Sequence, residues 1–377
     1  MGRKPRKWIF LTISARRAAL YVAAGAALLM IAAFVLPGLL GNGSTAEENT
    51  APPLQNTPKQ SIAVEVIRPK QTQPTPVALP DPLRAENGAY TIAWITDTQH
   101  YSREYPETFY AMTRFLQDNR NRMNLGYVAH TGDLVHHYDD EAQWDVAVRA
   151  MQTIADIPGG VLAGNHDVGT SRGDFTYYKK YFGEASQSSR ACYGESYQDN
   201  RCHYDLVQLG DTKYLFVYAS YEPDGDCIHW VNETLARYPE RIGVLCVHDY
   251  FKNDLTLSDS GKALYKKVVR SNPNLYLVLC GHRYQVGYVE DTFDDDGDGN
   301  VERRVYQIMA NYQAAGDVGG SGYLRLMQVD ETAGVIRNYT YSPVLDDYTY
   351  FDQPEALEEK YASDPSQEEF ILPIPWR

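Results

Sequence analysis

The chain has 377 residues, a formal net charge of −14 at pH 7 and five cysteines. Its length suits one large domain or two ordinary ones, and five cysteines are few for a disulfide-stabilised scaffold. The acidic charge disfavours a protein that grips long nucleic acids, because phosphate backbones need a basic track.

The N-terminus indicates a membrane anchor. Residues 1–17 carry six basic side chains and are expected to stay in the cytoplasm, and residues 18–40 form an apolar run long enough to span a bilayer as a helix. Signal peptides usually have a shorter apolar stretch, so an uncleaved anchor is favoured, and cleavage after Ala46 is the alternative. We therefore expect a single-pass protein of the cell membrane whose remaining chain, with a net charge of −20, lies outside the cytoplasm, or is secreted if cleaved.

Residues 41–85 are rich in Pro, Thr and Gln and predict an extended linker. From residue 86 to 345, helical and strand patterns alternate, which predicts an α/β domain with helix-covered sheets. Helices are expected at 106–121, 140–155, 229–237 and 259–269, and late strands at 286–290, 301–309, 323–329 and 335–340. Residues 346–377 are acidic and proline-bearing and are expected to form a surface extension.

Polar side chains follow five apolar, β-prone runs of the predicted domain. In layered α/β folds such strand ends meet at one edge, where ligands bind. Carboxylate, amide and imidazole groups together suit divalent transition metals, whereas each motif taken alone is equally typical of a cap or turn. The candidate residues are Asp97 and Gln99, Asp133, Asn165 with His166 and Asp167, His248, and His282.

The order of these motifs resembles the calcineurin-like metallophosphoesterase family, whose pattern runs Asp-x-His, Gly-Asp, Gly-Asn-His-Asp/Glu, a lone His and Gly-His-x-His. The resemblance covers roughly residues 90 to 340. It implies two mixed β-sheets packed as a sandwich and flanked by helices. It also implies hydrolysis of small phosphomonoesters or diesters at a dinuclear site, with two divalent or mixed-valence ions of Mn, Fe or Zn.

By this resemblance, Asp133 bridges the two metals. Asn165, His248 and His282 bind the second metal, and Asp97 binds the first. A carboxylate suits the bridging position because it offers two oxygens to two ions a few ångströms apart.

The chain departs from the family at the first metal. Gln99 stands where the family has the His of Asp-x-His, and Tyr284 stands where it has the final His. An amide oxygen binds transition metals more weakly than an imidazole, and a Tyr binds well only as a phenolate. His136 could reach this metal or the substrate instead, as could His130 or His137, although a solvated loop histidine is the more common fate.

His166 is the candidate for acid chemistry, because an imidazole titrates near neutral pH. Asp167 is expected to orient His166, as carboxylates often do for functional histidines. The alternative for Asp167 is a cap or turn residue.

Asp294, Asp296 and Asp298 resemble the start of a calcium loop, so calcium is a possible additional ligand. The alternative is a solvated hairpin tip, since Asp-Gly is a favoured turn. Val305 occupies the position where an EF-hand needs Glu.

Among the cysteines, Cys192 and Cys202 lie in a polar loop and could form a disulfide in an oxidising compartment. Cys246 and Cys280 each precede a candidate ligand histidine by two residues and are expected to be small buried core residues. Cys227 has no obvious partner.

Two functions fit these observations. The first is a membrane-anchored, extracytoplasmic, metal-dependent phosphoesterase. The alternative is a pseudo-enzyme with the same fold that serves as a surface binding or interaction module, which Gln99 and Tyr284 favour and the intact Gly-Asn-His-Asp motif disfavours.

Overall fold

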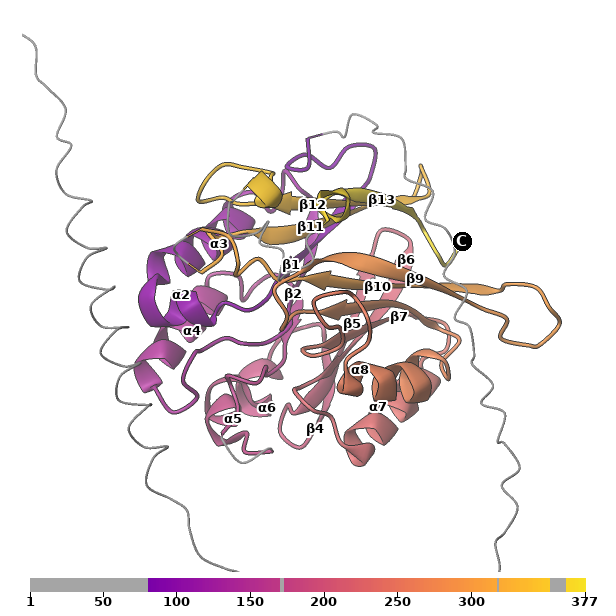
Figure 1. The fold of residues 1–377 in the computed structure, drawn as a ribbon, viewed down its shortest axis with the longest axis horizontal. Helices are drawn as coiled ribbons and strands as arrows, with labels where there is room; N and C mark the ends of the chain where they lie inside the picture. The colour runs from indigo at the N-terminus through magenta and orange to yellow at the C-terminus, as the bar shows by residue number, and fades with distance from the viewer. Residues whose placement is uncertain (1–80, 170–172, 317–318, 353–363) are drawn as a thin grey trace, which may run out of the picture. The chain divides into compact units, whose positions relative to one another are not determined.

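The computed structural model describes residues 81–169, 173–316, 319–352 and 364–377 (Figure 1). The expected cytoplasmic segment, the membrane anchor and nearly all of the linker lie outside these residues. Within the described part of the chain, no helix is both long and apolar enough to cross a bilayer.

The first sheet has six strands in the order β13–β12–β11–β1–β2–β3. It is mixed, because β1 pairs in parallel with β2 and antiparallel with β11. Its strands are β1 (Tyr90–Ile95), β2 (Leu125–His130), β3 (Gly159–Val161), β11 (Leu324–Asp330), β12 (Val335–Tyr341) and β13 (Phe370–Pro373).

The second sheet has seven strands in the order β4–β5–β6–β7–β8–β10–β9. It is also mixed, with a parallel centre from β6 to β10 and antiparallel pairs at both sides. Its strands are β4 (Tyr193–Tyr197), β5 (Cys202–Leu209), β6 (Thr212–Ala219), β7 (Ile242–Val247), β8 (Leu275–Cys280), β9 (Val286–Phe293) and β10 (Arg303–Ala310).

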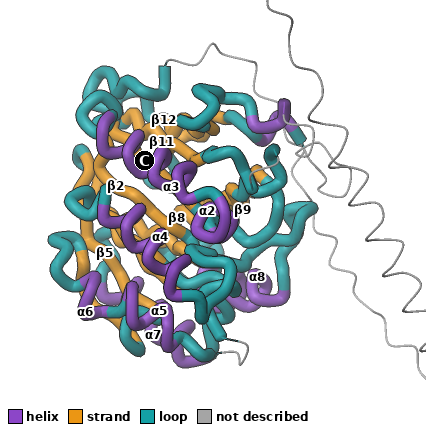
Figure 2. The backbone as a smooth tube through the Cα atoms, turned by 90° about the vertical axis from the view of Figure 1, so that its left-hand side faces the viewer, coloured by secondary structure: helices purple, strands orange, loops and turns teal. Residues whose placement is uncertain are grey.

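The helices lie outside the strands (Figure 2). Pro106 at the start of α3 and the Asp140 cap of α4, which accepts from the amide of Ala142, explain where these two helices begin. The helices are α2 (Gln99–Glu104), α3 (Pro106–Asp118), α4 (Glu141–Gln152), α5 (Thr176–Phe182), α6 (Glu184–Gln187), α7 (Gly225–Arg237) and α8 (Asp259–Leu264).

Successive side chains of each strand point to opposite faces of its sheet, so the buried residues fall into three cores. In β6, Phe216 and Tyr218 face the first sheet, whereas Leu215 and Val217 face the helices. The inter-sheet core includes Trp94, Tyr127, Phe216 and Tyr306; the α2–α4 core includes Ala93, Phe109, Leu116 and Trp144; the α7–α8 core includes Leu215, Val231, Leu264 and Val278. The architecture is therefore the expected pair of mixed β-sheets with helices outside.

The structure corrects the expected surface extension at 346–377. Phe370–Pro373 forms β13, which pairs with β12, and Phe370 and Leu372 are buried in the inter-sheet core. The acidic composition of the segment concealed a short continuous apolar run, Phe370–Pro373, which is consistent with a buried strand.

The expected Cys192–Cys202 disulfide is wrong. Cys192 belongs to the inter-sheet core, whereas Cys202 belongs to the α7–α8 core on the opposite face of the second sheet, and all five cysteines are free thiols. A two-atom bridge cannot cross a sheet. Cys246 and Cys280 are buried core residues, as expected.

Candidate metal centre

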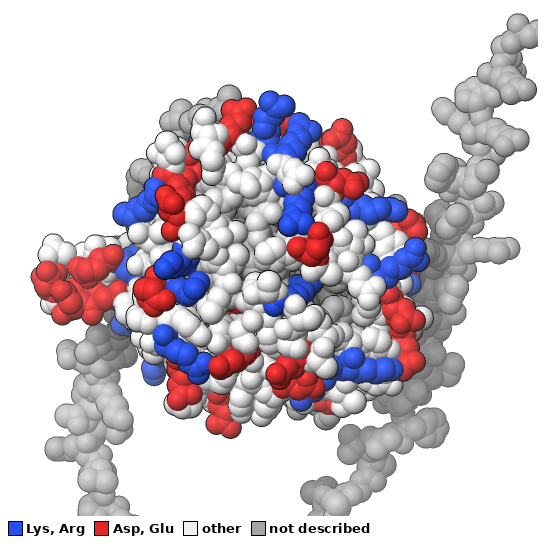
Figure 3. Space-filling view, turned by 180° about the vertical axis from the view of Figure 1, so that it is seen from behind, with Lys and Arg blue, Asp and Glu red and all other residues white. Residues whose placement is uncertain are grey.

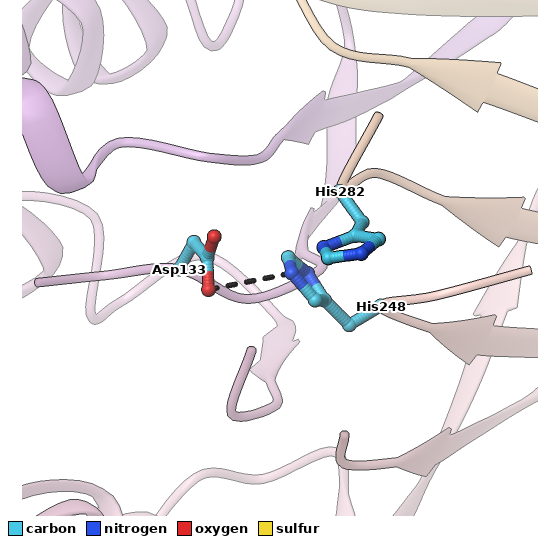
Figure 4. Close-up of side chains that lie close together, drawn as sticks. All are labelled: Asp133, His248 and His282. Carbon is cyan, nitrogen blue, oxygen red and sulfur yellow. Dashed lines mark ion pairs between the residues drawn. The ribbon is translucent and has the colours of Figure 1, made fainter. Parts of the chain in front are cut away.

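Candidate ligands from distant parts of the chain meet beyond the ends of four parallel strands. Asp133 follows β2, His248 follows β7 and His282 follows β8, and a ligand atom of each lies within 4.8 Å of those of the other two (Figure 4). Asn165, beyond β3, joins them through its side-chain oxygen, 3.0 Å from His248 Nε2. The four residues expected at the bridge and the second metal are thus brought together.

Asp133 and His248 form a buried ion pair, with Nε2 3.3 Å from Oδ1. Burial by itself raises the pKa of Asp133, but the charge and hydrogen bond of His248 outweigh it and lower the pKa to about 2. Burial lowers the pKa of His248, and Asp133 reverses this and raises the pKa to about 10. Without a cation between them, the pair therefore holds a proton where a metal would lie.

Hydrogen bonds orient His248 as a ligand. Its Nδ1–H donates to the carbonyl of Thr131 over 2.8 Å, so Nε2 faces Asp133 and Asn165. A backbone carbonyl behind a histidine is the usual support of a metal-binding imidazole.

Asp97 and His282 are linked through the backbone. The amide of His282 donates to both carboxylate oxygens of Asp97, at 3.1 and 3.0 Å. Burial, with the charge of Asp133, raises the pKa of Asp97 to about 7, although His248 opposes the shift. Burial and the nearby His248 lower the pKa of His282 to about 3, so its imidazole is neutral and ready to bind a metal.

Gln99 faces the same centre. It is buried at the start of α2, and its Nε2 donates to Asp133 Oδ2 over 3.1 Å. Its Oε1 and the Nδ1 of His282 are both buried without a hydrogen-bond partner among the described residues. Such unsatisfied acceptors in a polar cluster call for a cation, so the donor set fits a transition metal.

Tyr284 does not take the place of the missing histidine, because it packs against the inter-sheet core. Both ring nitrogens of His130 already have hydrogen-bond partners, so neither faces the metal centre. Nε2 contacts Thr98 Oγ1 at 3.1 Å, and Nδ1 accepts from the amide of Gly132. The His130 ring thus links the loop after β1, through Thr98, to the loop after β2, through Gly132.

His166 lies at the edge of the centre. Its amide donates to Asp133 Oδ1 over 2.9 Å, and its Nδ1–H donates to the carbonyl of His136 over 2.9 Å, which leaves Nε2 for other partners. The ring stacks on His136 at 4.8 Å, and His136 stacks on His100 at 5.3 Å. The half-buried His166 is therefore held in one orientation.

Asp167 does not orient His166 as expected. Its carboxylate accepts from the amides of Val135 (3.0 Å) and Gly164 (2.8 Å), and it is buried. Burial and the charge of Asp133 raise the pKa of Asp167 to about 7. Its role in the structure is to tie the Asp133 loop to the Asn165 loop.

Two glycines let the loops approach closely. A Cβ on Gly164 would lie 2.2 Å from Asp133 Oδ1, and a Cβ on Gly281 would lie 2.1 Å from Asp97 Oδ2. The Gly of Gly-Asn-His-Asp and the Gly of Gly-His are thus needed for the ligands that contact them, not only for a turn.

Two neighbours of the centre were not predicted from the sequence. Gln313, beyond β10, donates from Nε2 to the carbonyl of Asp97 over 3.0 Å. Tyr221, beyond β6, has its ring centroid 6.1 Å from those of both His248 and His282. Only the position of Tyr221 just after the apolar run of residues 212–219 could have drawn attention to it.

The acidic turn between β9 and β10 projects from the domain (Figure 3). Ligand atoms of Asp294, Asp296, Asp298 and Glu302 lie within 4.8 Å of one another, and all four side chains are exposed. Exposed carboxylates adopt such clusters without an ion, so calcium binding here stays a prediction.

The family model described as calcineurin-like phosphoesterase matches residues 90–307. The uncharacterized protein YvnB of Bacillus subtilis (strain 168) is 38% identical over 293 residues, which cover 77% of this chain and 22% of that protein. The chain thus spans about a fifth of the length of that relative.

Solved structures with a similar fold include two phosphatases. A dimetal phosphatase from Danio rerio has a TM-score of 0.47 at 10% identity and covers 77% of this chain and 100% of that chain. The purple acid phosphatase PPD1 from yellow lupin has a TM-score of 0.44 at 12% identity and covers 71% and 54%.

Proposed function

Because the chain belongs to the calcineurin-like phosphoesterase family, we propose that it hydrolyses small phosphomonoesters or diesters at a dinuclear metal centre. The observation that carries the proposal is the convergence of Asp133, His248 and His282, with the Nδ1 of His282 buried and lacking a partner among the described residues.

Asp133 would bridge the two ions. Asn165, His248 and His282 would hold one of them, and Asp97 with the Oε1 of Gln99 would hold the other. Two ions of Mn, Fe or Zn would supply an activated water and would neutralise the phosphoryl oxygens.

His166 would protonate the leaving oxygen of the ester. Its Nδ1–H is already engaged by the carbonyl of His136, so Nε2 is the atom that carries the transferred proton. An alkoxide leaves far more readily when a proton reaches it in the transition state, which is why this ring is the expected acid.

We further propose, from the sequence alone, that the domain lies outside the cytoplasm. The basic segment 1–17 and the apolar run 18–40 favour a single-pass anchor, with the phosphoesterase domain outside the cytoplasm. In that setting the substrate would be a small extracytoplasmic phosphoester rather than a long nucleic acid, since the chain after residue 17 carries a net charge of −20.

A binding module without catalysis is the second candidate. It is favoured by the amide of Gln99 in place of an imidazole and by the packing of Tyr284 against the core, both of which weaken the first metal site.

Hydrolysis of mono- and bis-p-nitrophenyl phosphate by the full chain, with added Mn²⁺ or Fe²⁺, distinguishes the two. His166→Ala should lower kcat by about 10²–10⁴-fold with metal content unchanged, Asp133→Ala should lose both metal and activity, and His229→Ala, at an exposed histidine of α7, should match the wild type. A wild-type chain that binds metal and hydrolyses no more than Asp133→Ala would establish the binding module.

A further inference from the structure

Two buried thiols meet away from the metal centre. Cys202 is the first residue of β5 and Cys227 lies in the first turn of α7, and neither is exposed. Both belong to the α7–α8 core, where each cysteine side chain is the largest influence on the pKa of the other. This is the pair that the sequence did not suggest, because the two residues come from different elements.

We propose that Cys202 and Cys227 form a disulfide that ties β5 to α7 when the chain folds in an oxidising compartment, with a small-molecule or protein disulfide as the oxidant. Its formation would not depend on the metal centre, and it rests on the proposed function only for the location outside the cytoplasm.

Neighbouring contacts hold the two backbones in place. Asp224 caps α7 by accepting from the amide of Cys227 over 3.0 Å, and the same carboxylate pairs with Arg201 over 2.8 Å. Arg201 directly precedes Cys202, so a charged bridge already links the start of β5 to the start of α7 beside the two thiols. A disulfide would join two buried side chains of the same core.

In the folded protein, Cys227 is the more acidic of the two thiols. The hydrogen bond from Cys202 and the charge of Arg201 lower its pKa, and these effects outweigh burial. A thiolate in the first turn of a helix also benefits from the positive end of the helix dipole. The neighbouring Cys227 side chain, together with burial, raises the pKa of Cys202.

The exchange balances as two thiol–disulfide steps. The Cys227 thiolate attacks one sulfur of the donor disulfide and expels the other as a thiolate. Cys202 then loses its proton, attacks the Cys227 sulfur and releases the second donor thiol, so two protein thiols are oxidised and one donor disulfide is reduced. Since both thiols are buried once α7 has docked, the exchange takes place during folding.

The test is to refold the full chain, in detergent, with oxidised glutathione or with a reductant, and to alkylate the free thiols after denaturation. Of the five cysteines, the oxidised protein should leave Cys192, Cys246 and Cys280 alkylated and should give a linked Cys202–Cys227 peptide. The disulfide closes a loop of moderate length, so the oxidised protein should unfold roughly 5–10 °C higher than the reduced protein.

Cys192→Ala is the matched control, since it removes a buried thiol of the other core and should leave the linked peptide intact. Cys227→Ala should abolish the redox dependence of the unfolding temperature. Five alkylated cysteines in the folded, oxidised wild type, or a bond between any other pair, would overturn the proposal, and this readout holds even if Cys227→Ala does not fold.

Discussion

At the scale of single residues, Asp167 has a structural role, because its carboxylate accepts hydrogen bonds from two buried backbone amides. Replacing it by Ala leaves the amides of Val135 and Gly164 buried without their acceptor, which should cost roughly 2–4 kcal/mol of unfolding free energy. Urea unfolding of the metal-free protein measures this loss. Asp139→Ala, at an exposed carboxylate nearby, should change the stability by less than about 0.5 kcal/mol; equal effects at both positions would contradict the assignment.

The proton shared by Asp133 and His248 makes metal affinity depend on pH. His248 keeps its proton up to a pKa of about 10 in the metal-free protein, and a metal needs the neutral ring. Binding must therefore release this proton, and affinity should rise about tenfold per pH unit between about pH 8 and 9, and more steeply near pH 7, where Asp97 also loses a proton. Competition with a chromophoric chelator measures the slope, and an affinity that is constant over this range would show that His248 is not a ligand.

The ligands were predictable because each directly follows an apolar run, so its place at the sheet edge depends only on local pattern. Two contacts were not predictable: the hydrogen bond from the Val135 amide to Asp167, and the one from His166 to the His136 carbonyl. Val135 and His136 both lie in the loop after Asp133, and the path of that loop depends on tertiary contacts. For the same reason, the contact of Gln313 with Asp97 left no signal in the sequence.

At the scale of elements, the loops after β2 and β3 must touch for the centre to form. Gly164→Ala would place a methyl group 2.2 Å from Asp133 Oδ1, so Asp133 must move, and metal affinity should fall at least tenfold. Isothermal titration with Mn²⁺ measures the change. Gly225→Ala, at the start of α7 where the added Cβ meets nothing within 4 Å, should bind metal like the wild type; a Gly164→Ala variant that also does so would show that the loops tolerate separation.

The elements themselves were largely predictable. The apolar periodicity of α3 and α4 and the runs that became β9 to β12 gave both type and position. The strand β13 was missed because only four residues of an acidic segment form it, and the cysteine pairing was wrong because loop position does not tell which face of a sheet a side chain takes.

At the scale of the whole molecule, the two sheets are joined by a buried hydrogen bond. Tyr127 of β2 donates its hydroxyl to Asp205 of β5 over 2.5 Å. Burial raises the pKa of Asp205 from 3.8 to about 7, although Tyr127 opposes the shift. The folded protein thus holds a proton that the unfolded chain has lost, and unfolding free energy should fall as pH rises from about 4 to 7, by an amount on the order of 4 kcal/mol.

Asp205→Asn tests this link between the sheets, because the amide still accepts from Tyr127 and does not titrate. Relative to the wild type, the variant should gain stability as pH rises from about 4 to 8, measured by urea unfolding with a chelator present. Asp211→Asn, at an exposed carboxylate in the turn after the same strand, should show no such trend. A constant difference between Asp205→Asn and the wild type would mean that Asp205 is ionised in the folded state.

The pairing of β1 with β11 brings Tyr90 beside Val329, so 239 residues separate two neighbouring strands. At ribosomal speeds of about 5–20 residues per second, β1 emerges roughly 10–50 s before its neighbour exists. During that time one edge of β1 lacks its partner strand. Biosynthesis of this domain therefore benefits from whatever shields a nascent chain, and overproduction that outpaces such protection should yield aggregates rather than folded protein.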